Sequence, residues 1–129
     1  MIFFGPNNQN NIDNLARQAI ESQYDSKCDV IEKKQKEIKN ITKNVEEKVL
    51  TDKACRVSFE DIYVNTETNT EAKKVQKIKL FIAPELEIKP GSKIIVTGRG
   101  RTTEYKNSGE PAVYNTHQEI MLELWKGWA

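Results

Sequence analysis

The sequence predicts a mainly β protein, built as a small barrel or sandwich of antiparallel strands. Two observations indicate this class. From Cys55 to Leu124, apolar and polar residues alternate in several short runs, as half-buried strands require. Turn signals rich in Pro, Gly and Asn separate these runs at close spacing. At 129 residues the chain has the length of one domain.

Composition and charge limit the classes of function. A hydrophobic share of 37% with 30% charged residues is low in apolar material, which indicates polar arms outside the core or surface that is buried on assembly. Twenty basic residues balance 19 acidic ones, so no net positive field attracts nucleic acid or a membrane. We recognise no secretory signal and no apolar run of transmembrane length, so a cytoplasmic product with reduced Cys28 and Cys55 is expected.

A short amphipathic helix is expected at residues 11–23, with Asn11 as its N-cap. Its apolar residues recur at helical spacing, namely Ile12, Leu15, Ala16, Ala19 and Ile20. In a monomer this stripe packs on the domain, and in an oligomer it docks on a neighbour. We therefore divide the chain into an N-terminal helical arm, residues 1–23, and a β-barrel domain, residues 24–129.

Residues 28–50 fit two structures. Ile31, Ile38 and Val45 lie seven apart in a segment rich in Glu, Lys and Gln, and helix propensity favours a helix there. The alternative is a polar hairpin that turns near Lys39 and Asn40. The pattern alone favours the helix.

The following strand begins the regular alternation. Cys55, Val57 and Phe59 point to one side, and the apolar phase then slips to Ile62 and Val64, which predicts a bulge near residue 61. Residues 65–72 are polar throughout and predict a long exposed loop. Later strands are expected around residues 78–82, 94–96, 113–114 and 120–124, with turns at 84, 90–91, 98–101 and 107–111.

The sequence offers no convincing catalytic or metal centre, and no cofactor is expected. His117 is the only histidine, and no Gly-x-Ser-x-Gly elbow accompanies it, so we interpret it as a hydrogen-bonded strand residue. Cys28, Cys55 and His117 are scattered singly, whereas metal ligands usually come in closely spaced pairs. Inert thiols on neighbouring strands explain the two cysteines.

Two other features suit protein interfaces. Residues 98–101 (GRGR) precede a strand-like segment, not the helix of a phosphate-binding loop, so we expect a hairpin turn that exposes Arg99 and Arg101. Trp125 and Trp128 are either core residues or interface anchors. An OB-like nucleic-acid-binding module is an alternative, with Tyr105 and Tyr114 as stacking residues, although the balanced charge counts against it.

Several residue strings, in order and spacing, resemble one phage family, the XkdH-like proteins of PBSX-type prophages. That family is similar in turn to the head-completion, or stopper, proteins of long-tailed phages. The resemblance covers residue 24 to the C-terminus. The strings are residues 24–30 (YDSKCDV), 55–58 (CRVS), 79–82 (KLFI), 88–94 (IKPGSKI), 111–114 (PAVY) and 117–120 (HQEI), with Tyr105 and residues 108–109 (SG) between them.

The resemblance implies a small antiparallel β-barrel with no enzymatic activity, and it favours the hairpin for residues 28–50. It further implies a six- or twelve-fold homo-oligomeric ring at the virion neck, made in the host bacterial cytoplasm. The portal or adaptor protein would lie above the ring and the tail terminator or other tail proteins below. Packaged DNA would meet only the channel lumen, and no membrane is involved. A tail terminator or another ring protein of the neck or tail end is the alternative.

Under this resemblance, two sets of residues are predicted to make contacts. The interface set consists of Leu15, Ile20, Arg99, Arg101, Trp125 and Trp128. The channel-loop set consists of Glu67, Thr68, Asn69 and Glu71.

Overall fold

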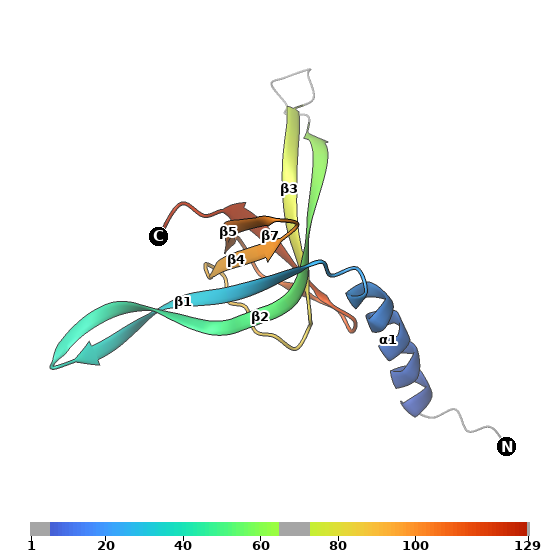
Figure 1. Cartoon of the computed structure of the whole chain (residues 1–129), viewed down its shortest axis with the longest axis horizontal. Helices are drawn as coiled ribbons and strands as arrows, with labels where there is room; N and C mark the ends of the chain where they lie inside the picture. The colour runs from blue at the N-terminus through green and yellow to red at the C-terminus, as the bar shows by residue number, and fades with distance from the viewer. Residues whose placement is uncertain (1–5, 65–72, 129) are drawn as a thin grey trace.

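The computed structural model of the chain describes residues 6–64 and 73–128 (Figure 1). These residues form one helix, α1 (Pro6–Glu21), and seven strands. The strands are β1 (Ser26–Ile38), β2 (Ile41–Val64), β3 (Lys73–Ile82), β4 (Lys93–Gly98), β5 (Arg101–Asn107), β6 (Ala112–Val113) and β7 (Gln118–Leu124). The predicted channel-loop residues Glu67, Thr68, Asn69 and Glu71 lie outside the described residues.

The strands close into a barrel-like ring of antiparallel pairings, which confirms the predicted fold class. β1 pairs with β2 and β4, β2 pairs with β3, β4 pairs with β5, and β5 pairs with β7. The ring is completed by β3 and β7, which pair from Ile78↔Leu122 to Ile82↔Gln118. The short strand β6 pairs antiparallel with the start of β7, at Gln118 and Glu119. Closure satisfies strand edges that would otherwise stay open.

The core fills the inside of the barrel with alternate residues of every long strand. Leu80, Ile82, Ile94 and Ile120 are fully buried, and each such side chain stabilises the fold by about 1.5–3 kcal/mol. The remaining buried apolar side chains are Cys28, Val30, Cys55, Val57, Ile88, Val96, Tyr105 and Leu122. The period-two alternation in the sequence therefore predicts correctly which face of each strand is buried.

Residues 28–50 form the hairpin, not the helix that local propensity favours. β1 and β2 pair as far as Ile38↔Ile41, and Lys39 and Asn40 form the two-residue turn with φ of 51° and 62°. Cys28 and Val30 are buried in the core, where β1 also pairs with β4. These contacts, distant in sequence, outweigh helix propensity, which is a weak preference of at most about 1 kcal/mol per residue for non-proline residues.

The bulge lies earlier in β2 than the sequence predicts. The β2–β3 register runs from Cys55 to Val64 without a shift, whereas the β1–β2 register shifts on both sides of Val30. Asp52, with φ of 51°, donates its backbone N–H to Oδ1 of Asp29 at 2.9 Å. That hydrogen bond is the main cause of the lowered pKa of Asp29. The prediction at residue 61 is wrong because β2 has left the barrel there and Ile62 meets no core on either face.

Two hairpins continue beyond the barrel as two-stranded ribbons (Figure 1). We call residues 32–47 the first arm, because β1 pairs with β4 only as far as Ile31. The second arm consists of residues 60–64 and 73–77, because β3 pairs with β7 only from Ile78 onward. The 24-residue strand β2 contributes to both arms, so the two ribbons leave one barrel in different directions.

Helix α1 begins at Pro6, five residues before the predicted start at Asn11. Proline suits the first helical position, where its missing N–H would have no helical partner. The helix leans away from the barrel on the side opposite the first arm (Figure 1). Arg17 ties it to the barrel domain through Glu85, with the Nη2 and Oε1 atoms 2.5 Å apart.

Gly98 is required where β4 meets β1. A Cβ at this position would lie 2.1 Å from Oγ and 2.9 Å from the backbone Cα of Ser26, its partner in the register. We predict that Gly98→Ala lowers the free energy of unfolding by about 1–3 kcal/mol, the usual cost of overpacking. Urea unfolding measures the change.

Gly109→Ala is the matched control, since its added Cβ would meet nothing within 4 Å. Its stability should stay within about 0.5 kcal/mol of the wild type. Equal stability of the two variants would contradict the close β1–β4 approach.

Candidate assembly surfaces

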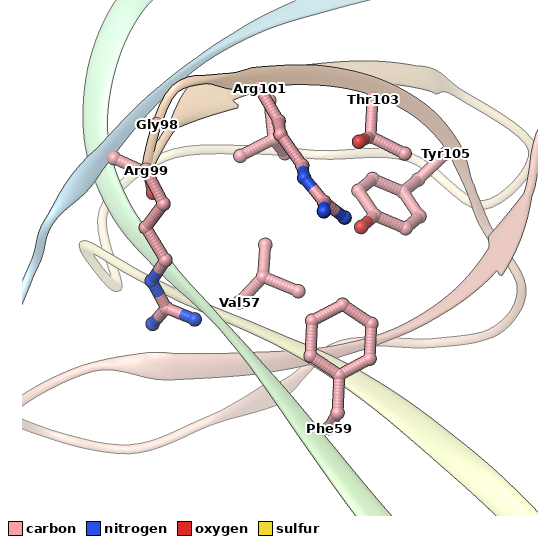
Figure 2. A pocket seen from close by; sticks show the side chains of 9 residues that line it. Val57, Phe59, Gly98, Arg99, Arg101, Thr103 and Tyr105 are labelled. Carbon is pink, nitrogen blue, oxygen red and sulfur yellow. The ribbon is translucent and has the colours of Figure 1, made fainter.

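One end of the barrel opens into a hollow lined by the two predicted arginines. The β4–β5 turn is a two-residue hairpin in which Arg99 and Gly100 have φ of 53° and 73°. It holds Arg99 and Arg101 over a hollow of about 510 Å³. Figure 2 shows the Arg101 side chain extending toward the ring of Tyr105, with Val57 and Phe59 of β2 across the opening. We call this site the barrel mouth.

The two arginines differ in how firmly they are held. Nε of Arg99 donates to Oδ2 of Asp25 at 2.6 Å, and this hydrogen bond is the main cause of the lowered pKa of Asp25. Arg101 is exposed, and it makes no hydrogen bond or ion pair with any residue that the structure describes. Arg99 is therefore committed to holding the start of β1, whereas the Arg101 guanidinium is available to a partner.

The barrel mouth combines an apolar floor with a cationic rim. Val57, Val96 and Tyr105 form the floor, and Phe59 stands at the edge with half of its surface exposed. The guanidinium can pair with a carboxylate of a partner, and the neighbouring aromatic rings can pack against an apolar or aromatic side chain next to it. The site is therefore chemically suited to a protein segment with an acidic residue.

Trp125 and Trp128 form a pair at the base of the first arm. Their ring centroids lie 4.6 Å apart in an edge-to-face arrangement, and Nζ of Lys93 lies 5.1 Å from the centre of the Trp125 ring. Nε1 of Trp128 donates to Oε1 of Glu46 at 2.8 Å. Both residues are half-buried, so they brace the arm and remain partly accessible.

The predicted interface residues on α1 lie in different environments. Leu15 is 67% exposed and Ile12 is 52% exposed. Ile20 lines a hollow of about 280 Å³ with Tyr24 and Phe81. Burial there raises the pKa of Tyr24 to about 12. The helix therefore contacts the barrel through its last turn and leaves the rest of its apolar stripe uncovered.

His117 lies in the turn before β7, not within a strand. Its Nε2 is 3.1 Å from Oε2 of Glu119, and its Nδ1 is 2.9 Å from the hydroxyl of Thr116. Tyr114 stacks on the ring at 5.0 Å. Burial opposes ionisation of Glu119, but hydrogen bonds from His117 and Lys79 outweigh it and lower the pKa of the carboxyl. These contacts hold the β6–β7 turn on the barrel.

Cys28 and Cys55 lie on neighbouring strands as free, buried thiols. Their mutual hydrogen bond, with burial, raises the pKa of the Cys28 thiol, which keeps it neutral and unreactive. Among residues 6–64 and 73–128, no three His, Cys, Asp or Glu side chains gather into a metal-binding group. No helix in the described part of the chain is long and apolar enough to cross a membrane.

The arms expose apolar side chains that sequence reasoning did not select. The second arm exposes Tyr63, Val64 and Val75, and the first arm exposes Ile38 and Ile41 at its tip. In the sequence these apolar residues look like those of a core strand. Only the structure, in which the ribbons run past the barrel, shows that they are exposed. Exposed apolar groups on protruding ribbons are typical of surfaces that bind another protein.

Comparison with known proteins gives one structural likeness. No family model and no curated protein matches the chain. It is similar to the solved structure of the phage-like element PBSX protein xkdH from Bacillus subtilis, over 76% of this chain and 91% of that chain. The sequence identity is 13% and the TM-score is 0.47. At these values the likeness carries no argument about function.

The Arg99–Asp25 pair predicts a specific pH dependence. The pKa of Asp25 is lowered in the folded chain, so the pair stabilises the fold above the ordinary Asp pKa and this contribution is lost as pH falls through the folded value. Both groups are largely exposed, so the contribution is at most about 1 kcal/mol. In Arg99→Ala, the pKa of Asp25 should rise toward its ordinary value, as measured by NMR titration of its carboxyl.

Arg101→Ala is the control for this titration and should leave the Asp25 carboxyl unchanged. An equal rise of the Asp25 pKa in both variants would show that the general positive field of the turn, and not the Arg99 hydrogen bond, lowers it.

Proposed function

We propose that this chain is a structural virion protein of the phage neck that assembles into a ring between the head and the tail. The order and spacing of the residue strings that resemble the XkdH-like family support this role. The observation that carries it is the shape of the subunit, a small closed barrel from which two β-ribbons and a helix extend with uncovered apolar side chains.

Each extension needs a partner for a physical reason. A two-stranded ribbon is marginally stable in water on its own, and its unpaired edges accept further strands. Helix α1 likewise leaves Ile12 and Leu15 exposed. In a ring, neighbouring subunits cover these surfaces, and repetition of one contact closes the assembly with cyclic symmetry.

The proposed ring joins the portal or adaptor on one side to the tail on the other and surrounds the DNA channel. Arg101 at the barrel mouth and the outer faces of Trp125 and Trp128 are the proposed contacts with these partners. The chain acts by holding proteins together and catalyses no reaction. DNA leaves such a channel quickly, which suits a subunit with a formal net charge of +1.

Native mass spectrometry of the purified protein, alone and mixed with adaptor and tail proteins of the same phage, tests the proposal. We expect a closed oligomer of defined subunit number, visible as a ring by electron microscopy. A monomer under all these conditions would contradict the neck role. The rival role of an OB-like nucleic-acid binder predicts instead a steep fall of DNA affinity with salt in filter binding.

A further inference from the structure

The tip of the first arm carries an apolar pair among lysines. Ile38 and Ile41 are directly opposite in the register, so both side chains lie on the same face. They are 46% and 57% exposed. A pair of isoleucines at the outermost point of a ribbon has no role in the barrel core, to which β1 contributes through its start and β2 through its middle.

Lysines surround this apolar pair. Residues 33–45 contain Lys33, Lys34, Lys36, Lys39 and Lys43 against the single acid Glu37, a formal charge of +4. Lys34 and Lys36 share Glu47 at 3.2 and 4.0 Å. Among the described residues, Lys33, Lys39 and Lys43 have no ion-pair partner. The tip therefore presents an apolar centre with uncompensated positive charge around it.

A groove of complementary chemistry lies elsewhere on the same chain. It is a hollow of about 370 Å³ between the β3–β4 connection and β6, and we call it the acidic groove. Its apolar lining includes Leu86, Pro111 and Val113, the last 62% exposed. Nε2 of the buried Gln118 donates to the backbone carbonyls of Ala83 and Leu86 at 2.7 and 2.6 Å, which holds this wall in place.

The charge of the groove is opposite to that of the tip. Three glutamates and one lysine line it, namely Glu85, Glu87, Glu110 and Lys89, a formal charge of −2. Glu85 is engaged by Arg17. Glu87 and Glu110 are exposed and have no ion-pair partner in the described part of the chain. The groove thus offers two free carboxylates beside an apolar floor.

The tip of a given copy is directed away from its own groove. Nζ of Lys89, in the groove lining, lies 3.8 Å from Oε1 of Glu32 at the base of the first arm. Six further residues along β1 carry Ile38 about 20 Å from that base. The ribbon runs outward from the barrel (Figure 1). The groove that the tip can enter therefore belongs to another molecule.

We propose that the tip of the first arm of one copy docks in the acidic groove of the next copy. Ile38 and Ile41 pack against Leu86 and Val113, while Lys39 and Lys43 pair with Glu87 and Glu110. The two surfaces differ, so the contact runs head to tail, and its repetition generates a ring when the rotation closes. This inference rests on the proposed ring and names the contact that forms it.

Charge reversal on each side, followed by reversal on both, tests the contact. Lys39→Glu with Lys43→Glu, and separately Glu87→Lys with Glu110→Lys, should each weaken self-association at least about tenfold, because like charges would then face each other. The variant that carries all four changes should recover oligomers, since its tip and groove are complementary again. Analytical ultracentrifugation measures all three variants against the wild type.

Lys27→Glu with Lys53→Glu on the barrel wall is the matched control, because it makes the same charge change outside both arms, helix α1 and the acidic groove, and it should assemble like the wild type. A second measurement joins Asn40→Cys and Glu87→Cys in one chain. Mild oxidation should link copies into covalent multimers, because the proposed contact brings the two new thiols together. Both native cysteines are buried and should not react.

The outcomes separate this inference from the proposed function. A wild-type ring that survives both double reversals would overturn the tip–groove contact and leave the neck role standing. Loss of the ring without recovery in the four-change variant would also overturn it and would indicate that the tip binds a different partner. A wild type that never oligomerises would contradict the ring itself.

Discussion

Pairing between β3 and β7 is the constraint on which the rest of the structure depends. It joins Ile78–Ile82 to Gln118–Leu122 and so closes the strands into a ring that encloses the core. Inside this ring, strand edges are satisfied by neighbours. Open edges and exposed apolar side chains remain where β1, β2 and β3 run past the ring, on the two arms. Closure of the barrel therefore leaves long unpaired strand edges on the two arms, next to these exposed apolar side chains.

The balanced net charge conceals a strong separation of charge. Residues 33–45, the outer part of the first arm, carry +4, and Glu32, Glu46 and Glu47 lie at its base. The lining of the acidic groove carries −2, within a chain whose formal charge is +1. If the charge were uniformly distributed, electrostatics would favour no particular orientation of one subunit on the next. Opposite charges at two separate places favour head-to-tail association and oppose arm-to-arm contacts, so electrostatics selects partners even where it adds little affinity.

Sequence reasoning succeeded where local rules decide the structure. The turns at 90–91 and 98–101, the buried faces of the strands and the paired inert thiols all follow from residue type and alternation. It failed where contacts distant in sequence decide. Residues 28–50 form a hairpin because Val30 packs in the core. The bulge lies at Asp52, and not at the predicted residue 61, because the register with β1 shifts there. The acidic groove was beyond sequence reasoning, since Leu86 and Val113 line the same hollow only because β6 pairs with β7.

Amide hydrogen exchange, compared between the free subunit and the assembled ring, tests the central claim most directly. Our account predicts strong protection of Leu80 and Ile120 in both states. It predicts fast exchange across residues 32–47 in the free subunit and slow exchange of the same amides in the ring, because an uncovered two-stranded ribbon opens easily. First-arm amides that are equally protected before and after assembly would contradict a barrel whose arms are completed only by other subunits.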